Sequence, residues 1–173
     1  KSMPYIQTLE LNSTCGKFVL EPLERGYGQT VGNALRRVLL SSIQGMAVTA
    51  VRIDKVFHEF AAIPGLKEDA TNFLLNVARL AIACTLEVPP TEPVSLIISV
   101  KGPGKITGAD VQCPVGYTIT NPEVYLGYIS DAKVTFGCEI LAEWGSGYVL
   151  PDRHEQWKGL IGTLAVGSQF TPV

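Results

Sequence analysis

The chain has 173 residues, of which 46% are hydrophobic and 17% are charged, and its formal net charge is −2. This length supports one domain, or two small ones, with a real hydrophobic core, and the composition excludes a disordered chain, a collagen and a disulfide-stapled mini-protein. The charge offers no basic patch for phosphates, so we expect no direct nucleic-acid contact, and no apolar run reaches the roughly 18 residues of a membrane span.

The first segment has the pattern of a β-hairpin. Residues 5–11 nearly alternate between apolar and polar side chains, residues 12–16 have turn composition, and residues 17–21 form the returning strand. Pro22 then ends the strand because it lacks a backbone N–H, and the glycines of residues 26–28 mark a sharp loop.

A helix is expected after this loop. Its main apolar stripe has helical spacing and consists, after Val31, of Leu35, Val38, Leu39 and Ser42. Asn33 and Thr30 are alternative N-caps, and Gly45 fits the C′ position. Leu40 and Ile43 lie off the stripe. The helix therefore has apolar residues on more than one face and needs more than one packing partner.

The rest of the chain predicts strands at 47–57, 94–101, 105–107, 116–120, 124–129, 133–143 and 148–150. A second helix is expected to begin near Glu68 and end near Cys84, with a core stripe of Ala70, Phe73, Leu74, Val77 and Ala81. Residues 151–158 are expected to form a surface loop in which His154 is solvated. Together these elements predict an α+β fold of mostly antiparallel strands with two main helices.

The residues do not form a catalytic or metal-binding constellation. The loop 26–32 fails the dinucleotide fingerprint because its third glycine comes one residue late, and it fails the P-loop pattern because Asn33 follows Gly32. Neither His58 nor His154 has a partner at ligand spacing, so we expect no metal and no cofactor. His58-Glu59 is a titratable pair with two interpretations: general acid–base chemistry beside this loop, or the favoured structural or contact role.

The pair Arg36-Arg37 also has two interpretations. It is either an ordinary solvated helix face or a protein-contact site, since arginine is enriched at interface anchors and pairs with carboxylates or carbonyls. The two-sided helix favours the contact site. A charged fraction of 17%, against about 25% for an average soluble protein, agrees with a surface that is partly covered by another molecule.

A long motif carries a family resemblance. The string FVLEPLERGYGQTVGNALRRVLLSS at residues 18–42 closely resembles the amino-terminal domain of the bacterial-type RNA polymerase alpha subunit. The segments 47–49, 58–60 (HEF) and 63–69 (IPGLKED) match as well, with weaker matches at 75–76, 102–104, 147–149 and 170–173. The resemblance therefore spans nearly the whole chain.

The resemblance implies part of a dimerisation domain with an inserted α+β domain. Residues 1–44 would begin the dimerisation domain, residues 45–165 would form the insertion domain, and residues 166–173 would return to the dimerisation domain. It also implies a subunit without an active site of its own, belonging to DNA-directed RNA polymerase, a nucleotidyltransferase complex. Two copies would dimerise and then serve as an assembly platform in transcription, one copy docking the β subunit and the other β′.

The same resemblance assigns contact residues on the first helix. The dimer-facing side would carry Tyr27, Val31, Leu35, Val38 and Ser42. Arg37 and Leu40 fall at the family's β-docking positions. His58 and Glu59, at the end of a strand, would lie close to that docking surface.

Three departures from the family pattern qualify this assignment. The family's dimerisation domain, linker and carboxy-terminal DNA-binding domain continue past the FTPV motif, so no promoter contact belongs to these residues. The family lysine after Leu-Asn-x is Ala78 here, and residues 143–146 replace basic residues. These differences leave open a diverged dimerisation or regulatory module outside a polymerase. The implied compartment is the bacterial cytoplasm, with the plastid stroma as the alternative.

Overall fold

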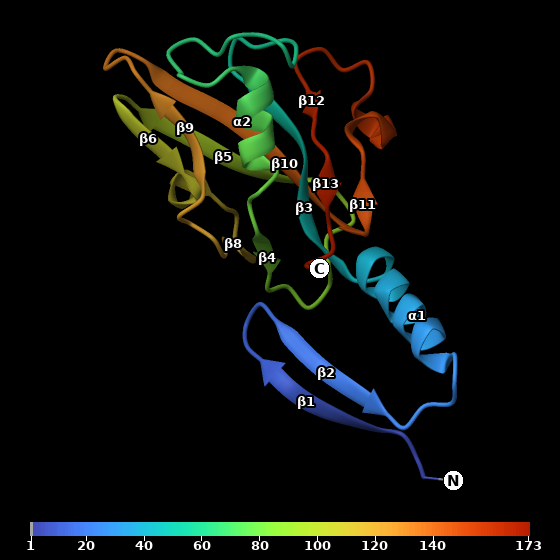
Figure 1. Cartoon of the computed structure of the whole chain (residues 1–173). Helices are drawn as coiled ribbons and strands as arrows, with labels where there is room; N and C mark the ends of the chain where they lie inside the picture. Colours follow the sequence, from blue (N-terminus) through green and yellow to red (C-terminus); the bar gives the residue numbers. More distant parts are fainter. Residues whose placement is uncertain (1) are drawn as a thin grey trace. The chain divides into compact units, whose positions relative to one another are not determined.

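The computed structural model describes residues 2–173, and the chain divides into two compact units, Lys1–Leu39 and Leu40–Val173 (Figure 1). The described strands are β1 (Tyr5–Leu11), β2 (Gly16–Glu21), β3 (Gln44–Ile53), β4 (Ile82–Cys84), β5 (Val94–Lys101), β6 (Gly104–Thr107), β7 (Val111–Gln112), β8 (Tyr117–Ile119), β9 (Tyr125–Ile129), β10 (Thr135–Ser146), β11 (Tyr148–Val149), β12 (Leu164–Ala165) and β13 (Ser168–Gln169). The helices are α1 (Tyr27–Ser41) and α2 (Ala70–Val77), with 3₁₀ turns at Gly108–Asp110, Pro151–Arg153 and Glu155–Trp157.

The amino-terminal hairpin is confirmed. Strands β1 and β2 pair antiparallel, from Tyr5 opposite Glu21 to Leu11 opposite Gly16. The side chain of Asn12 shapes the turn, because its Oδ1 accepts the backbone N–H of Thr14 at 2.9 Å and that of Cys15 at 2.8 Å. This is the asparagine turn chemistry that the sequence indicates.

The expected start of the first helix is wrong, because α1 begins at Tyr27 and contains both Thr30 and Asn33. Gly26 adopts a φ of +89°, which L side chains rarely take, and the Tyr27 N–H donates to the Glu24 carbonyl at 3.0 Å. This turn reverses the chain just ahead of Tyr27. The positive φ of Gly26 therefore places the start of the helix at Tyr27, ahead of both expected caps.

Gly45 is not the C′ residue of this helix. Helix α1 ends at Ser41, and Gly45 lies inside β3. A Cβ atom at Gly45 would stand 2.6 Å from the Phe170 carbonyl oxygen, closer than real Cβ contacts come. Glycine is needed here because two backbone segments approach each other, a contact that local sequence cannot reveal.

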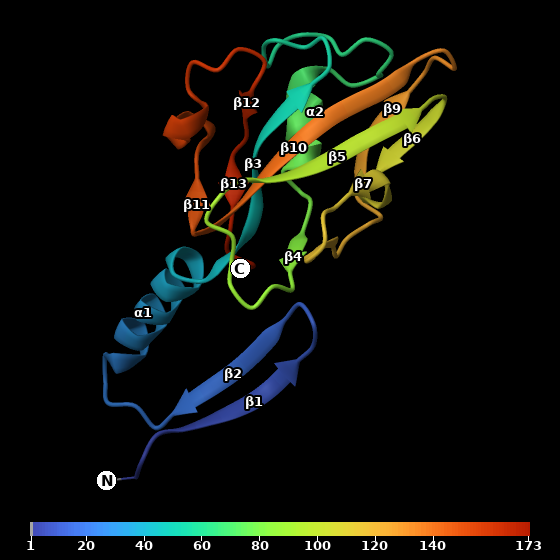
Figure 2. The ribbon, with the colours of Figure 1, turned by 180° about the vertical axis from the view of Figure 1, so that it is seen from behind.

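The Leu40–Val173 unit is built on a five-stranded sheet in the order β12-β3-β10-β5-β7 (Figure 2). All its pairings are antiparallel, which confirms the expected α+β class. Leu141 pairs with Ala50 and Ala142 with Val48, so Thr49 is an extra residue, a β-bulge. Residues 46–51 are all buried, and β3 ends at Ile53, four residues before the expected end of the strand at 57.

Helix α2 covers one face of this sheet and lies in front of it in Figure 1 and behind it in Figure 2. Its start is capped by Asp69, whose Oδ1 accepts the Asn72 N–H at 2.8 Å. The helix buries Ala70, Phe73, Leu74 and Val77, as predicted. Phe73 meets Phe136 of β10 edge-to-face at a centroid distance of 5.2 Å. This face of the sheet therefore holds the hydrophobic core.

The expected end of α2 near Cys84 is wrong. The helix stops at Val77, and Ala81 is exposed. The Ala81 N–H donates to Asn121 Oδ1 at 2.8 Å, and its carbonyl accepts the Thr120 N–H at 2.8 Å. These partners place the following residues of β4 beside β8, so tertiary pairing overrides a continuing apolar pattern.

Glu68 joins the start of α2 to β9. Its carboxylate accepts the phenol of Tyr125 and, at 2.9 Å, the backbone N–H of Tyr128. Burial raises the pKa of Tyr125 to about 12, and the hydrogen bond to Glu68 adds to the rise. The phenol is therefore held in its neutral form as a donor.

Residues 151–158 form two 3₁₀ turns, and the expected solvated His154 is wrong. Its side chain is buried, and its Nε2 lies 3.0 Å from the Val166 carbonyl and 2.9 Å from Ser168 Oγ. The polar residues around His154 do not reveal its burial, because its hydrogen-bond partners Val166 and Ser168 come later in the chain.

Candidate protein-interaction surface

Residues 2–39, the described part of the amino-terminal unit, form no hydrophobic core of their own. All residues of β1 are exposed, and α1 contains no buried residue. A two-stranded hairpin is marginally stable at best in water, and so is a lone helix of 15 residues, particularly one that contains two glycines, Gly28 and Gly32. The large apolar side chains exposed in this unit include Met3, Tyr5, Ile6, Leu9, Leu11, Phe18, Tyr27, Leu35 and Val38. These elements need a further surface to pack against.

The predicted dimer-facing residues form one stripe along α1. At 3.6 residues per turn, Tyr27, Val31, Leu35 and Val38 fall within about 80° of arc. Tyr27, Leu35 and Val38 are each more than half exposed, and Val31 is partly buried. Ser42 lies in the turn that follows the helix. The stripe is thus available to another apolar surface.

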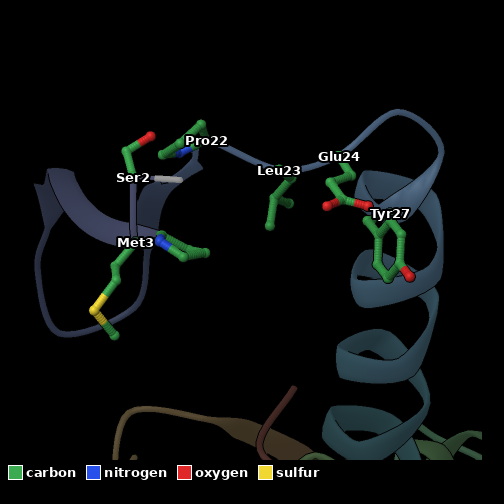
Figure 3. A pocket seen from close by; sticks show the side chains of 7 residues that line it. Ser2, Met3, Pro22, Leu23, Glu24 and Tyr27 are labelled. Carbon is green, nitrogen blue, oxygen red and sulfur yellow. The ribbon is translucent and has the colours of Figure 1, made fainter.

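A hollow lies at the start of this stripe (Figure 3). It is lined by three segments: residues 2–4 before β1, residues 22–24 after β2, and Tyr27 in the first turn of α1. Met3, Pro22 and Leu23 make most of its wall apolar, and Glu24 adds a carboxylate. Such a wall suits an apolar side chain from a partner protein better than a polar substrate.

Arg37 and Leu40 occupy a different face of the same helix. They are three residues apart, so they are neighbours on the helix surface, and they lie well away from the stripe. Both residues are exposed, as Arg36 is. The structure therefore confirms that α1 carries apolar residues on more than one face.

His58 and Glu59 lie in the Leu40–Val173 unit, but not at a strand end as expected. Strand β3 ends at Ile53, and the chain then turns through Lys55, which has a φ of 63°. The Glu59 carbonyl accepts the Thr71 hydroxyl at 2.6 Å, which ties this loop to α2. Both side chains are exposed. The arrangement suits contact with another molecule.

Glu59 also lines an apolar groove that sequence reasoning missed. The groove runs between α2 and residues 165–169, and Phe60, Leu75 and Tyr148 are its most exposed large side chains. Ala78, at the position where the family resemblance implies a lysine, lines it together with Arg79. Leu75, an apolar residue on the outer side of α2, is the sequence signal that indicates this groove. The signal is insufficient alone because the other lining residues come from distant segments of the chain.

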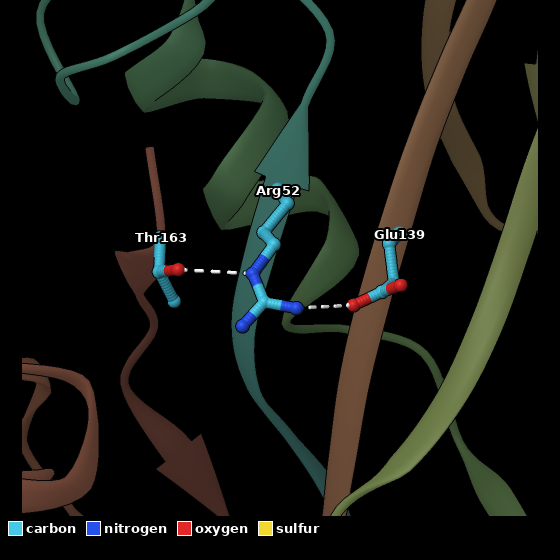
Figure 4. A network of polar contacts seen from close by, with 3 residues as sticks. All are labelled: Arg52, Glu139 and Thr163. Carbon is cyan, nitrogen blue, oxygen red and sulfur yellow. Dashed lines mark hydrogen bonds and ion pairs between the residues drawn. The ribbon is translucent and has the colours of Figure 1, made fainter. Parts of the chain in front are cut away.

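The opposite face of the sheet carries a small polar network (Figure 4). Arg52 Nη1 pairs with Glu139 Oε1 at 2.7 Å, and Arg52 Nε donates to Thr163 Oγ1 at 3.0 Å. The Arg52 and Glu139 side chains are 46% and 33% exposed, so water screens this ion pair and it contributes little to stability. Over residues 2–173, no group of three or more potential metal ligands comes together.

Comparison with known proteins identifies the family of this chain. Residues 51–171 match the family model described as the RNA polymerase Rpb3/RpoA insert domain. The chain belongs to this family. It is 42% identical over 170 residues to the DNA-directed RNA polymerase subunit alpha of Carboxydothermus hydrogenoformans, which covers 98% of this chain and 53% of the relative.

Two further relatives carry the same name. The subunit of Alkaliphilus metalliredigens is 42% identical over 172 residues, covering 98% of this chain and 53% of the relative. The subunit of Saccharopolyspora erythraea is 43% identical over 160 residues, covering 92% and 43%. These matches confirm the resemblance to alpha subunits drawn from residues 18–42. The chain spans about half the length of these relatives.

The described part of the chain contains no helix that is long and apolar enough to cross a membrane. This agrees with the absence of a long apolar run from the sequence.

Proposed function

We propose that this chain acts as the assembly module of an RNA polymerase alpha subunit, dimerising and then docking the β and β′ subunits without chemistry of its own. The observation that carries the proposal is the amino-terminal unit, whose described residues 2–39 expose two different faces of α1 and form no core. A surface of this kind is stabilised by partner proteins, not by a small ligand. The names of the relatives supply the class of partner.

Dimerisation would use the stripe of Tyr27, Val31, Leu35, Val38 and Ser42. Its exposed apolar side chains are repeated in every copy, so a two-fold contact can bury the same residues from both partners. The hollow beside Tyr27 would accept an apolar side chain at the edge of this contact.

Large-subunit docking would use Arg37, Leu40, His58 and Glu59. Arg37 offers a planar donor for a carboxylate or a backbone carbonyl, and Leu40 offers apolar area beside it. Glu59 lines the apolar groove beside α2, which would offer a second docking surface within the Leu40–Val173 unit. Where the family resemblance implies a lysine, this groove has Ala78, and the adjacent Arg79 would supply the positive charge there.

The variant Arg37→Ala tests the docking assignment in polymerase reconstituted from all its subunits. Removing one partner of a charge-assisted hydrogen bond at an interface typically costs about 2 kcal/mol, so we expect the β subunit to bind roughly 30-fold more weakly. The matched control is Lys105→Ala, which removes an exposed cation on β6, outside α1 and outside the groove, and should change binding far less. Unchanged assembly of Arg37→Ala at low subunit concentration would refute the assignment.

A further inference from the structure

Residues 150–163, which we call the strap, connect β11 to β12 through two 3₁₀ turns. The backbone hydrogen bonds of the strap run within the strap itself. They include Arg153 N–H to the Leu150 carbonyl at 3.0 Å, Trp157 N–H to the His154 carbonyl at 3.1 Å and Thr163 N–H to the Leu160 carbonyl at 3.2 Å. The strap therefore does not continue the hydrogen-bond ladder of the sheet.

The strap is joined to the sheet by side chains. Trp157 Nε1 donates to Thr49 Oγ1 at 3.2 Å, and Gln156 Nε2 donates to Glu143 Oε2 at 2.9 Å. Thr163 Oγ1 accepts from Arg52, as Figure 4 shows. Contacts of this kind can break one after another without disturbing the pairing of β3 with β10.

His154 differs from the rest of the strap because it is the one buried side chain among residues 150–163, all of which the structure describes. Its Nε2 contacts two groups beyond the strap, the Val166 carbonyl at 3.0 Å and Ser168 Oγ at 2.9 Å. Ser168 Oγ lies in turn 2.6 Å from the Val48 carbonyl of β3. The ring is thus connected to the central part of the sheet through one hydroxyl.

The hydrogen atoms in this cluster can be assigned from donor capacity. The carbonyls of Val48 and Val166 can only accept, and Ser168 has a single hydroxyl hydrogen. Nε2 of His154 must carry a hydrogen because it lies 3.0 Å from the Val166 carbonyl, which can only accept. Ser168 Oγ lies 3.0 Å from the same carbonyl and 2.6 Å from the Val48 carbonyl, so its hydrogen goes to the nearer acceptor, Val48. The result is a directed chain from the His154 ring through Ser168 to the Val48 carbonyl.

We propose that the strap is a latch that opens independently of the sheet, with His154 as its lock. Local turns, a small number of exposed or half-buried side-chain ties and a single buried anchor are the properties of a segment that unfolds locally at low cost. Opening would uncover Thr49 on the sheet. It would also remove Pro151 from the wall of the groove that Val166 and Gly167 line. The latch would thereby control the shape of one side of this groove.

Hydrogen exchange of the whole unmodified chain gives the first test. The amides of residues 153–160 should exchange at least tenfold faster than those of β10, because their opening does not require the sheet to open. Equal exchange rates, with strap and sheet opening together, would overturn the latch.

Variants test the lock. In His154→Ala we expect strap exchange to rise at least another tenfold, with faster trypsin cleavage after Arg153 and Lys158 and unchanged exchange in β5 and β10. His154→Gln can place an amide N–H near the position of Nε2 and should restore most of the protection. Lys158→Ala, which removes only the exposed pair with Glu155, is the control for exchange and should leave it unchanged.

Two results would overturn the role of His154: strap exchange that stays at the wild-type rate in His154→Ala, or an equal rise in β5 and β10. If His154→Ala does not fold, His154→Gln decides: a small rise in exchange confined to the strap supports the lock, and an equal rise in β5 and β10 overturns it. These measurements involve no polymerase subunit, so failure of the latch leaves the proposed function untouched.

Discussion

Truncation of Leu35 tests the dimer stripe quantitatively. Leu35 is 56% exposed in the single chain, and full burial of a leucine side chain is worth about 1.5–3 kcal/mol. Since slightly more than half of the Leu35 side chain is still exposed, its burial on dimerisation should contribute about 1–1.5 kcal/mol of binding free energy per copy. Because the residue enters a two-fold contact twice, Leu35→Ala should cost about 2–3 kcal/mol, which raises the dimer dissociation constant about 30- to 150-fold.

Sedimentation velocity over a concentration series measures this constant directly. The matched control is Ile161→Ala, which truncates an aliphatic side chain that is 89% exposed and lies outside α1. The control should leave the dimer unchanged. An unchanged dissociation constant for Leu35→Ala, or an equal shift in both variants, would refute the assignment of the stripe to the dimer contact.

Two further predictions concern the stability of the Leu40–Val173 unit. Gly45→Ala would place a Cβ 2.6 Å from the Phe170 carbonyl oxygen. We expect the free energy of unfolding, measured by urea denaturation, to fall by about 2 kcal/mol. A fall below about 0.5 kcal/mol would show that the two segments separate easily. In an absorbance titration the Tyr125 phenol should ionise near pH 12, and this absorbance step should be missing from Tyr125→Phe. Since its folded pKa is raised above the ordinary value near 10, its contribution to stability is complete below pH 10 and declines as the pH rises toward 12; a Tyr125 transition near pH 10 would contradict the assigned environment.

The elements of the fold could be predicted where local pattern and burial agree. The strand at Val94–Lys101 was predicted with its observed bounds, and the core residues Phe73 and Val77 follow from helical spacing. Prediction failed where distant backbone decides. The Asn121 side chain accepts a hydrogen bond from the backbone that follows α2, and the close approach of the Phe170 carbonyl leaves room only for glycine at position 45. No window of neighbouring residues contains these partners.

The candidate site shows the same division. The two-faced character of α1 is visible in the sequence because it depends on spacing within a single helix. The apolar groove is not visible there, since Phe60, Leu75 and Tyr148 come together only in three dimensions. His154 was misjudged for the same reason: a polar loop context suggests solvent, while its partners Val166 and Ser168 lie more than ten residues further along the chain.

Affinity capture of this chain from its native source, followed by intact-mass analysis of every retained protein, tests the central claim most directly. The assembly role predicts recovery of two very large subunits together with two copies of the protein that carries this chain. Recovery of that protein alone, or with small partners only, under gentle salt would contradict the role. The chain would then retain the family's fold in a dimerisation or regulatory module outside a polymerase.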